Sequence, residues 1–366
     1  MDEIRIIIAG GGTGGHLFPA IAIGEKIQSL YKNSHIHYMG SIFGIESKVL
    51  PVKLYPHTLL PIKGIQRNFS FNSIMKNIGL PYFYLKSLSI AQELFDELLP
   101  NIVVGTGGYA SAIPIKLGIK NKLPVVLQEQ NSYPGLTTRV YASRANIVCT
   151  AFGEAHSYLK EAKCLLTGNP IRSNISLGLR ENGAKIFKLN ASLTTLFVFG
   201  GSQGSIVLNQ LIEKLVNELK ITNFQVLWQT GSKHYNRYKH LDSDLIRVLP
   251  FIDSMADAYA LSDLIFSRSG ALTISEIMAV GKASILLPFS KAAENHQYKN
   301  AKTLADYNAA VLLEERTVNS EIVYRTIKNA LNNKNKLMKM GQKAKSMSKL
   351  NATENIANHI IELALA

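Results

Sequence analysis

The order of apolar strand, glycine-rich loop and helix occurs at the start of the chain and again near its middle. The first copy reads IRIIIAGGGTGGHLFPAIAI from Ile4, and the second reads TTLFVFGGSQGSIVLNQLIEKL from Thr194. A wholly apolar strand is typical of a parallel sheet whose two faces are both covered by helices. A chain that begins such a unit twice is predicted to fold as two Rossmann-like α/β domains.

Strands and helical patterns alternate through both halves. The apolar runs NIVVGTG, LPVVLQEQ and NIVCTAF belong to the first half, and FQVLWQTG, SDLIFSRSG and ASILLPFS belong to the second. The breaker cluster Gly168, Asn169 and Pro170 predicts a link between two domains. We therefore expect an N-terminal domain over residues 1–168, completed by a C-terminal helix over residues 352–366, and a C-terminal domain over residues 169–351.

The first glycine loop predicts an anion site. Glycine lets backbone N–H groups approach a ligand at a helix start, where unpaired donors and the helix dipole favour a phosphate. The alternative is that these glycines only make a tight turn. The loop is not the dinucleotide fingerprint, because its glycines are spaced differently and the next strand, HIHYMGS, ends without an acidic residue. The glycines concerned are Gly10, Gly11, Gly12, Gly14 and Gly15.

Composition places the chain among folded proteins of the cytosol. Hydrophobic residues make up 46% of the 366 residues and charged residues 18%. Cys149 and Cys164 lie in apolar stretches without zinc-ligand spacing, so we expect them to be reduced and buried. We expect no secretion signal and no membrane span, because no apolar run reaches the ~18 residues that a spanning helix needs.

A formal net charge of +14 favours partners that carry phosphate. Seven lysines lie between Lys328 and Lys349, but no base-stacking aromatic residues accompany them. This pattern favours a solvated helical face over a nucleic-acid site, and we expect no nucleic-acid partner.

Polar and glycine-rich loops follow almost every predicted strand. They read GGGTGGH, GTGGYAS, QEQNSYPG, FGGSQG, PFID, SRSGALTISE and PFSKAAENHQ. Because ligands of parallel sheets collect at the carboxyl ends of the strands, we expect the two sheets to face a central cleft lined by these loops. Glycine loops in both halves indicate two anionic substrates.

Seven motifs in this order resemble the MurG glycosyltransferases of bacterial cell-wall synthesis, which have the two-domain GT-B architecture. The motifs are GGGTGGHLFPA, GTGGYAS, LQEQNSYPG, GNPIR, FGGSQG, RSGALTISE and HQYKNA. The chain departs from the family at His296, where a first glutamine commonly stands before Gln297, and at Ala112, where a glycine is expected. The first departure puts one contact with the sugar in doubt.

The resemblance implies an inverting transfer of N-acetylglucosamine from UDP-N-acetylglucosamine to the C4 hydroxyl of the muramyl sugar of lipid I, an undecaprenyl diphosphate-linked muramyl peptide. The product would be lipid II. The enzyme would act as a peripheral protein at the cytoplasmic face of the bacterial inner membrane. Alternatives are a UDP-N-acetylglucosamine 2-epimerase, another GT-B lipid glycosyltransferase, or a non-catalytic nucleotide-sugar-binding scaffold.

The resemblance also assigns binding residues. The acceptor diphosphate is expected at Gly14, Gly15, Gly107, Gly108 and Tyr109. The donor is expected at Thr13, Gly14, Gly15, Asn131, Arg172, Ser202, Gln203, Ile252, Ala271, Leu272, Thr273, Glu276 and Gln297.

Two donor contacts have a physical reason of their own. Ser202 and Gln203 are predicted at a helix start that suits a diphosphate, although Ser202 could serve only as the helix cap. Glu276 is expected about a turn and a half into a helix, where a carboxylate can accept from both ribose hydroxyls. Pairing with a lysine on the helix surface is the alternative for Glu276. Arg172 could neutralise the leaving diphosphate or form an interdomain ion pair.

His16 is the candidate general base, because an imidazole of ordinary pKa near ~6.5 is largely neutral at cell pH and a helix N-terminus lowers that pKa. A structural role, bonding the glycine loop or a phosphate, is the alternative. Glu129 is the second candidate, and it too could serve only to cap its loop. We expect no metal or other cofactor, since no carboxylate pair has metal-ligand spacing.

The stretch RNFSFNSIMKNIGLPYFYLKSL interleaves apolar residues with cations, which favours contact with an anionic bilayer. A buried helix broken at Pro81 is the alternative. The residues of this candidate membrane patch are Ile74, Lys76, Leu80, Phe83 and Lys86.

Overall fold

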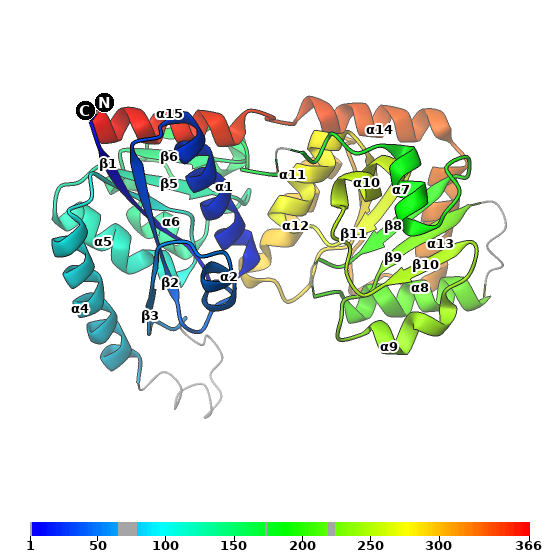
Figure 1. The fold of residues 1–366 in the computed structure, drawn as a ribbon. Helices are drawn as coiled ribbons and strands as arrows, with labels where there is room; N and C mark the ends of the chain where they lie inside the picture. Colours follow the sequence, from blue (N-terminus) through cyan, green and yellow to red (C-terminus); the bar gives the residue numbers. More distant parts are fainter. Residues whose placement is uncertain (1, 65–78, 173, 202, 219–223) are drawn as a thin grey trace. The chain divides into compact units, whose positions relative to one another are not determined.

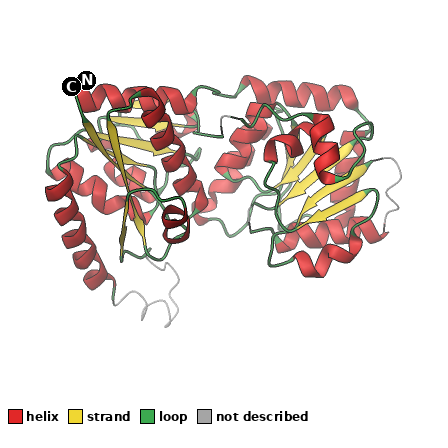
Figure 2. Ribbon diagram, viewed as in Figure 1, coloured by secondary structure: helices red, strands yellow, loops and turns green. Residues whose placement is uncertain are grey.

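A computed structural model describes residues 2–64, 79–172, 174–201, 203–218 and 224–366. The predictions for Ile74, Lys76 and Ser202 lie outside these residues. The chain divides into two compact units, which are considered separately below: unit 1 is Met1–Ile171 with Leu350–Ala366, and unit 2 is Arg172–Lys349. Each unit has a sheet with helices on both of its faces (Figure 2).

Unit 1 is built on a seven-stranded sheet in the order β3-β2-β1-β4-β5-β6-β7, and every strand pair in it is parallel. The strands are β1 (Ile4–Ala9), β2 (Ser34–Ser41), β3 (His57–Leu60), β4 (Ile102–Gly105), β5 (Val125–Glu129), β6 (Ile147–Thr150) and β7 (Cys164–Leu166). The α-helices are α1 (Gly14–Leu30), α2 (Glu46–Val52), α4 (Leu80–Leu98), α5 (Ala112–Lys120), α6 (Leu136–Tyr141) and α15 (Ala352–Leu365), with short 3₁₀ helices η1 (Tyr109–Ser111), η2 (Ala142–Arg144) and η3 (Gly153–Tyr158).

The period of two in β1 sends its side chains to opposite faces of the sheet. Ile6 and Ile8 pack with α1 and α15 on one face, whereas Ile7 packs with α4 and α5 on the other. The C-terminal helix α15 lies against α1 and completes the first of these layers (Figure 1). A strand buried on both faces must be apolar throughout, which explains the run of isoleucines.

Unit 2 repeats this plan with a six-stranded parallel sheet in the order β10-β9-β8-β11-β12-β13. Its strands are β8 (Thr195–Phe199), β9 (Gln225–Gln229), β10 (Ile246–Leu249), β11 (Leu264–Ser267), β12 (Ala283–Leu286) and β13 (Val311–Leu312). Its helices are α7 (Arg180–Phe187), α8 (Ile206–Glu218), α9 (Tyr235–Tyr238), η4 (Lys239–Leu241), α10 (Met255–Leu261), α11 (Ala271–Val280), η5 (Ala293–Asn295), α12 (His296–Asp306), α13 (Ser320–Leu331) and α14 (Lys334–Ser346).

Both sheets reverse the direction in which strands are added next to their first strand. In unit 1 this switch point lies between β1 and β4, and in unit 2 it lies between β8 and β11. Ligands of open parallel sheets bind beyond the carboxyl ends of the strands at such a point. The glycine loops after β1 and β4 meet at the first switch point, and the loops after β8 and β11 meet at the second.

Three helix starts refine the predictions. Helix α1 begins at Gly14, so the last two glycines of the loop form its first turn. Helix α8 begins at Ile206, later than the predicted start at Ser202 and Gln203, because the Ser205 hydroxyl accepts from Leu208 N at 3.3 Å and caps the helix. Pro81 lies in the first turn of α4, where proline is favoured.

Cys149 and Cys164 were both predicted to be buried, and the structure agrees for the first and not for the second. Both thiols are free; Cys149 is buried and Cys164 is only half-buried. Burial raises the pKa of the Cys149 thiol to about 12. The lysines of α14 are exposed, in agreement with a solvated helical face.

Replacing Ile356 by alanine should destabilise unit 1 selectively. This side chain of α15 is fully buried against β1 and α1, so its truncation is expected to cost about 3 kcal/mol. The single tryptophan, Trp228, lies in the core of unit 2 and reports on that unit alone. Denaturant unfolding should therefore show an earlier transition by far-UV circular dichroism and an unchanged transition by tryptophan fluorescence. The exposed Asn358→Ala is the control, and equal shifts in both signals would contradict the assignment of α15 to unit 1.

Candidate active site

The first glycine loop uses some of its N–H groups internally and leaves others unpaired. Gly10 N donates to Met39 O at 3.2 Å and Gly11 N donates to Gly107 O at 3.4 Å. Among the described residues, the N–H groups of Thr13, Gly14 and Gly15 have no hydrogen-bond partner. These three donors form the start of α1, where no acidic side chain competes for them. This helix start is therefore suited to an anion.

Packing explains the other glycines of the loop. A Cβ on Gly10 would lie 1.8 Å from the Thr106 hydroxyl, and a Cβ on Gly11 would lie 2.2 Å from a carboxylate oxygen of Glu46. A Cβ on Gly15 would meet only the Thr13 hydroxyl, at 3.6 Å, and so fits without strain. The tight-turn interpretation thus accounts for Gly10 and Gly11, and a Cβ on Gly14 would lie 2.9 Å from the Phe18 ring. Of these glycines, Gly15 is the one that packing does not explain.

Glu46 is a fully buried carboxylate beneath this loop. It accepts from Gly12 N at 3.0 and 2.9 Å and from Ser41 N at 2.8 Å. It lies at the start of α2, which follows β2. Glu46 lies four positions before Leu50, so both lie on the buried face of this helix. A glutamate on an otherwise apolar helix face is the signal in the sequence that could have marked Glu46. Our sequence analysis did not single it out.

His16 lies in the first turn of α1 and is half-buried, so a substrate can reach it. Its Nδ1 lies 3.1 Å from Gly11 O and 3.2 Å from the Thr13 hydroxyl. A backbone carbonyl can only accept, so this contact assigns the proton of the neutral ring to Nδ1 and makes Nε2 the basic nitrogen. The arrangement is the tautomer that a general base acting through Nε2 requires.

The loop after β4 passes close to the imidazole. Gly107 has φ +95° and Gly108 has φ +78°, and a Cβ on Gly107 would lie 2.9 Å from Cδ2 of His16. Only glycine fits this positive-φ turn at such a short distance. Tyr109 follows and its ring covers Gly12, 2.9 Å from a Cβ built there. Burial raises the pKa of Tyr109, and the charge of Glu46 adds to this effect.

Glu129 ends β5 and is buried, with both oxygens engaged. Oε1 accepts from Asn131 N at 3.0 Å and from Asn131 Nδ2 at 3.2 Å. Oε2 accepts from Gly135 N at 2.9 Å and from the Thr138 hydroxyl at 2.7 Å. Four donors on two oxygens match the loop-capping role better than that of a base, which needs a free lone pair.

In unit 2 the loop after β8 is tied to the loop after β11 by Arg268. Its guanidinium donates to the Ser205 hydroxyl at 3.0 Å, to Leu287 O and Pro288 O at 3.0 Å each, and to Glu315 at 2.8 Å. Gln203 is exposed just before the helix cap. Our sequence analysis missed Arg268, although an arginine directly after an apolar strand is a recognisable signal.

Helix α11 begins beside this loop. Within the described part of unit 2, the N–H groups of Ala271, Leu272 and Thr273 have no hydrogen-bond partner. Glu276 follows about a turn and a half later, as predicted, and its Oε2 accepts from the buried Tyr259 hydroxyl at 3.0 Å. Burial raises the pKa of Glu276, whereas the bond from Tyr259 and the charge of Arg172 act in the opposite direction.

Two further residues that are expected at the donor site already form hydrogen bonds within the protein. Ile252 N donates to Gln229 Oε1 at 2.8 Å, so only the Ile252 carbonyl remains for a ligand. Gln297 Oε1 accepts from Phe289 N at 2.9 Å, so this amide can offer a ligand its NH₂ group. A uracil edge that donates to Ile252 and a sugar hydroxyl that accepts from Gln297 would suit these groups.

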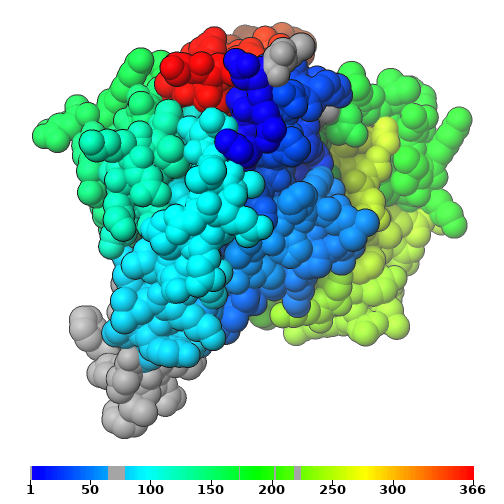
Figure 3. Space-filling view, turned by 60° about the vertical axis from the view of Figure 1, so that its left-hand side comes forward, coloured from blue at the N-terminus to red at the C-terminus, as the bar shows by residue number. Residues whose placement is uncertain are grey.

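The described part of the candidate membrane patch lies at the start of α4, on the outer surface of unit 1 (Figure 3). Lys86 is exposed, Phe83 and Leu80 are half-buried, and the neighbouring side chains of Tyr82 and Leu85 are 63% and 64% exposed. Lys63 Nζ lies 4.3 Å from the ring centroids of both Phe83 and Phe43. The start of α4 is thus on the surface, whereas Ser87, Ala91 and Phe95 bury its later turns.

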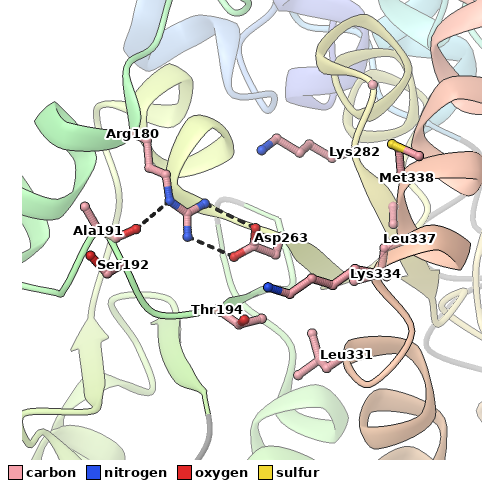
Figure 4. A pocket seen from close by; sticks show the side chains of 12 residues that line it. Arg180, Ala191, Ser192, Thr194, Asp263, Lys282, Leu331, Lys334, Leu337 and Met338 are labelled. Atoms are coloured by element: carbon pink, nitrogen blue, oxygen red, sulfur yellow. Dashed lines mark hydrogen bonds and ion pairs between the residues drawn. The ribbon is translucent and has the colours of Figure 1, made fainter.

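A separate cavity of about 380 Å³ lies in unit 2 (Figure 4). Thr194, Asp263 and Lys282, which directly precede β8, β11 and β12, line it. Arg180 forms an ion pair with Asp263 and donates to the carbonyls of Ala191, Leu193 and Leu261. The cavity lies at the amino ends of the strands, opposite to the switch-point loops, and its arginine is used to hold the fold together.

Neither a metal-binding cluster nor a membrane-spanning helix occurs among the residues that the structure describes. No cluster of three His, Cys, Asp or Glu side chains there could hold a metal ion. In the same residues, no helix combines the length and the apolar character needed to cross a membrane.

Comparison with known proteins agrees with this description. Residues 6–150 match the glycosyltransferase family 28 N-terminal domain, and residues 195–359 match the family 28 C-terminal domain. A relative from Flavobacterium psychrophilum, named UDP-N-acetylglucosamine–N-acetylmuramyl-(pentapeptide) pyrophosphoryl-undecaprenol N-acetylglucosamine transferase, is 36% identical over 99% of this chain and 98% of its own.

Solved structures give the same result. The crystal structure of Acinetobacter baumannii MurG superposes with a TM-score of 0.79 at 26% identity and covers 99% of this chain and 100% of its own. A UDP-GlcNAc 2-epimerase from Neisseria meningitidis bound to UDP-GlcNAc gives a TM-score of 0.65 at 13% identity over 99% and 100% of the two chains, which shows a shared fold alone.

Two units with parallel sheets, each matching a family 28 domain, define a GT-B glycosyltransferase, and the predicted fold class is confirmed. The extent and level of identity are specific to one branch of this class. The chain belongs to the MurG family of N-acetylglucosamine transferases.

Glu276→Gln should stabilise unit 2 at neutral pH by about 1 kcal/mol, because it removes a charge that burial disfavours. A carboxyl whose pKa is raised on folding destabilises the folded state above its folded pKa and has no such effect below its unfolded pKa. The gain should therefore be present at pH 7.5 and absent at pH 4. Unfolding followed by Trp228 fluorescence at both pH values measures it. Tyr259 can still donate to the glutamine oxygen, and a loss of stability at pH 7.5 would contradict this account.

Proposed function

We propose that this chain transfers N-acetylglucosamine from UDP-N-acetylglucosamine to the C4 hydroxyl of the muramyl sugar of lipid I. The relatives named for this activity match nearly the full length of the chain. The observation that carries the proposal within this structure is the contact of His16 Nδ1 with Gly11 O at 3.1 Å. Because the carbonyl can only accept, this contact assigns the ring proton to Nδ1 and the basic lone pair to Nε2, which is the atom that would take the proton of the substrate.

The acceptor binds in unit 1. The unpaired N–H groups of Thr13, Gly14 and Gly15 support binding of its diphosphate at the start of α1, beside the turn at Gly107 and Gly108. His16 removes the proton from the C4 hydroxyl as that oxygen attacks C1 of the donor sugar. Attack from the face opposite UDP inverts the configuration at C1, and the proton resides on Nε2 until it is released to water.

The donor binds mainly in unit 2. The ribose hydroxyls donate to Glu276, whose Oε1 has no hydrogen-bond partner among the described residues while Tyr259 holds Oε2. The loop at Gln203 and the start of α11 supply N–H groups for the diphosphate, and Arg172 adds a positive charge. These groups stabilise the charge that develops as the bond between C1 and the diphosphate breaks.

A defined assay tests the reaction. The protein is incubated with labelled UDP-N-acetylglucosamine and a lipid I analogue, and the disaccharide product and UDP are measured. Conversion of the UDP-sugar without an acceptor would instead indicate an epimerase. No turnover by a folded protein that binds UDP would indicate a scaffold.

Replacing His16 by alanine should lower kcat by about 10³-fold, the middle of the range for loss of a general base, with little change in UDP affinity. Turnover in this assay and UDP titration calorimetry separate the two effects. His35→Ala is the matched control, because His35 is an exposed histidine of β2 in the same unit. Near-normal turnover by the His16 variant would leave the imidazole only a structural role.

Contact with an anionic bilayer follows from the lipid acceptor. The exposed Tyr82 and Leu85, the cation at Lys86 and the lysine that covers Phe83 support a surface that inserts apolar side chains and attracts lipid phosphates. The protein would then act as a peripheral protein at the cytoplasmic face of the inner membrane, where lipid I is presented.

The double variant Phe83→Ser, Lys86→Glu should bind phosphatidylglycerol vesicles about ten-fold more weakly, because it removes an apolar contact and reverses a charge. Vesicle co-sedimentation measures the affinity. Lys339→Glu, on the exposed face of α14 in unit 2, makes the same charge change and should retain binding. Equal loss in both variants would show a non-specific effect of net charge.

A further inference from the structure

The peptide group between Gly11 and Gly12 is held from both sides by ionisable side chains. Its N–H, on Gly12, donates to the two oxygens of Glu46 at 3.0 and 2.9 Å. Its carbonyl, on Gly11, lies 3.1 Å from Nδ1 of His16 and accepts from it. One planar peptide group therefore connects a buried carboxylate to the imidazole.

We infer that Glu46 is a positioning residue that raises the basicity of His16 through this peptide, as a carboxylate–peptide–imidazole relay. The inference rests on the proposed role of His16 as the base. Hydrogen bonds in series polarise one another, so a carboxylate bonded to the N–H makes the carbonyl oxygen a stronger acceptor. A stronger acceptor at Nδ1 fixes the tautomer and stabilises the imidazolium that forms when Nε2 takes a proton.

The surroundings of Glu46 fix the geometry of the relay. The carboxylate is fully buried, and Ser41 N donates to the same oxygen as Gly12 N, at 2.8 Å. A Cβ on Gly40 would lie 2.4 Å from Cγ of Glu46, so glycines above and below leave the glutamate one position. In the described part of the chain, no lysine or arginine forms an ion pair with it. Its charge is therefore directed at the peptide.

Other groups near the imidazole do not replace this effect. Tyr109, which covers Gly12, has a pKa raised by burial and is therefore neutral at cell pH. Glu129 has both oxygens engaged by backbone N–H groups and the Thr138 hydroxyl. The start of α1 places positive dipole ends beside His16, which disfavours the imidazolium. Glu46 is the negative group that opposes this dipole.

Glu46→Gln tests the relay directly. Oε1 of Glu46 accepts from both Gly12 N and Ser41 N, so a glutamine oxygen in that position keeps one hydrogen bond to each. The substitution removes the charge and also the second bond from Gly12 N, because the amide NH₂ that replaces Oε2 cannot accept. The pKa of His16, measured by NMR titration of its imidazole, should fall by about half a unit, a modest shift for the loss of one charge that acts through a bridging group. The acid limb of kcat/KM should move to lower pH by the same amount, and kcat should fall by up to about three-fold with little change in KM, because a half-unit loss of basicity cannot lower the rate further.

Two comparisons make the result interpretable. Glu25→Gln removes an exposed carboxylate of α1 that accepts from Tyr55, and both the His16 pKa and the pH profile should stay unchanged. Glu46→Asp keeps the charge but withdraws it from the peptide, so its His16 pKa should fall between wild type and Glu46→Gln. Of the nine histidines, the His16 resonance is assigned by its loss in His16→Gln.

An unchanged His16 titration in folded Glu46→Gln would overturn the relay, even if turnover fell, because Glu46 would then only support the loop. Failure of the proposed function looks different. Wild-type protein without transfer activity, or an active His16→Ala, would remove the base assignment whatever the NMR titration shows. If Glu46→Gln does not fold, the comparison of Glu46→Asp with wild type gives the same NMR test.

Discussion

A helix start carries backbone N–H groups that the helix cannot pair, and a folded protein must either satisfy them or leave them for a ligand. The first switch-point loop does both. The internal acceptors Met39 O, Gly107 O and Glu46 take the N–H groups of Gly10, Gly11 and Gly12, while the start of α1 keeps its donors. A buried carboxylate beneath the loop repels an anion, so it confines the predicted phosphate site to the helix start. The contact between Glu46 and Gly12 N thus fixes the shape of the loop and also limits where an anion can bind.

At the second switch point, backbone and hydroxyl groups of the loops are held by a cation, Arg268, where unit 1 uses the carboxylate of Glu46. A hydroxyl, Ser205, caps α8, and the guanidinium of Arg268 holds that hydroxyl together with the carbonyls after β12. Glu315 neutralises the arginine. Burial acts to raise the pKa of Glu315, but the hydrogen bonds from Arg268 and Ser290 and the charge of Arg268 together lower it. Each unit thus uses a charged side chain behind its loop to fix backbone groups. The two sheets share the order of their first six strands, but the supporting group is a carboxylate in unit 1 and a guanidinium in unit 2.

The sequence predicted the strands well, because a strand buried on both faces has to be apolar along its whole length, as in β1 and β8. The residues at which helices begin were harder to predict from the sequence. The start of α8 depends on Ser205, whose hydroxyl is also held by Arg268, a residue 63 positions further along the chain that no local pattern reports. Glu46 escaped notice for a similar reason: its partner Gly12 lies 34 positions away. The candidate ligand-binding residues came from motifs, whereas the groups that hold them came only from coordinates.

Glu276 illustrates how a residue suited to ligand binding can lower the stability of the folded protein. Burial raises its pKa, yet the carboxylate keeps one oxygen for the Tyr259 hydroxyl and leaves the other without a partner in the described residues. A glutamine would bury less charge, but its single oxygen would already be engaged by Tyr259 and could not accept equally from two ribose hydroxyls. Arg172 reduces the penalty only in part, because its side chain is exposed and water screens its charge. A carboxylate in this environment would gain most from a ligand that brings hydroxyl donors. On the proposed function, binding of the ribose hydroxyls would therefore also stabilise the buried charge.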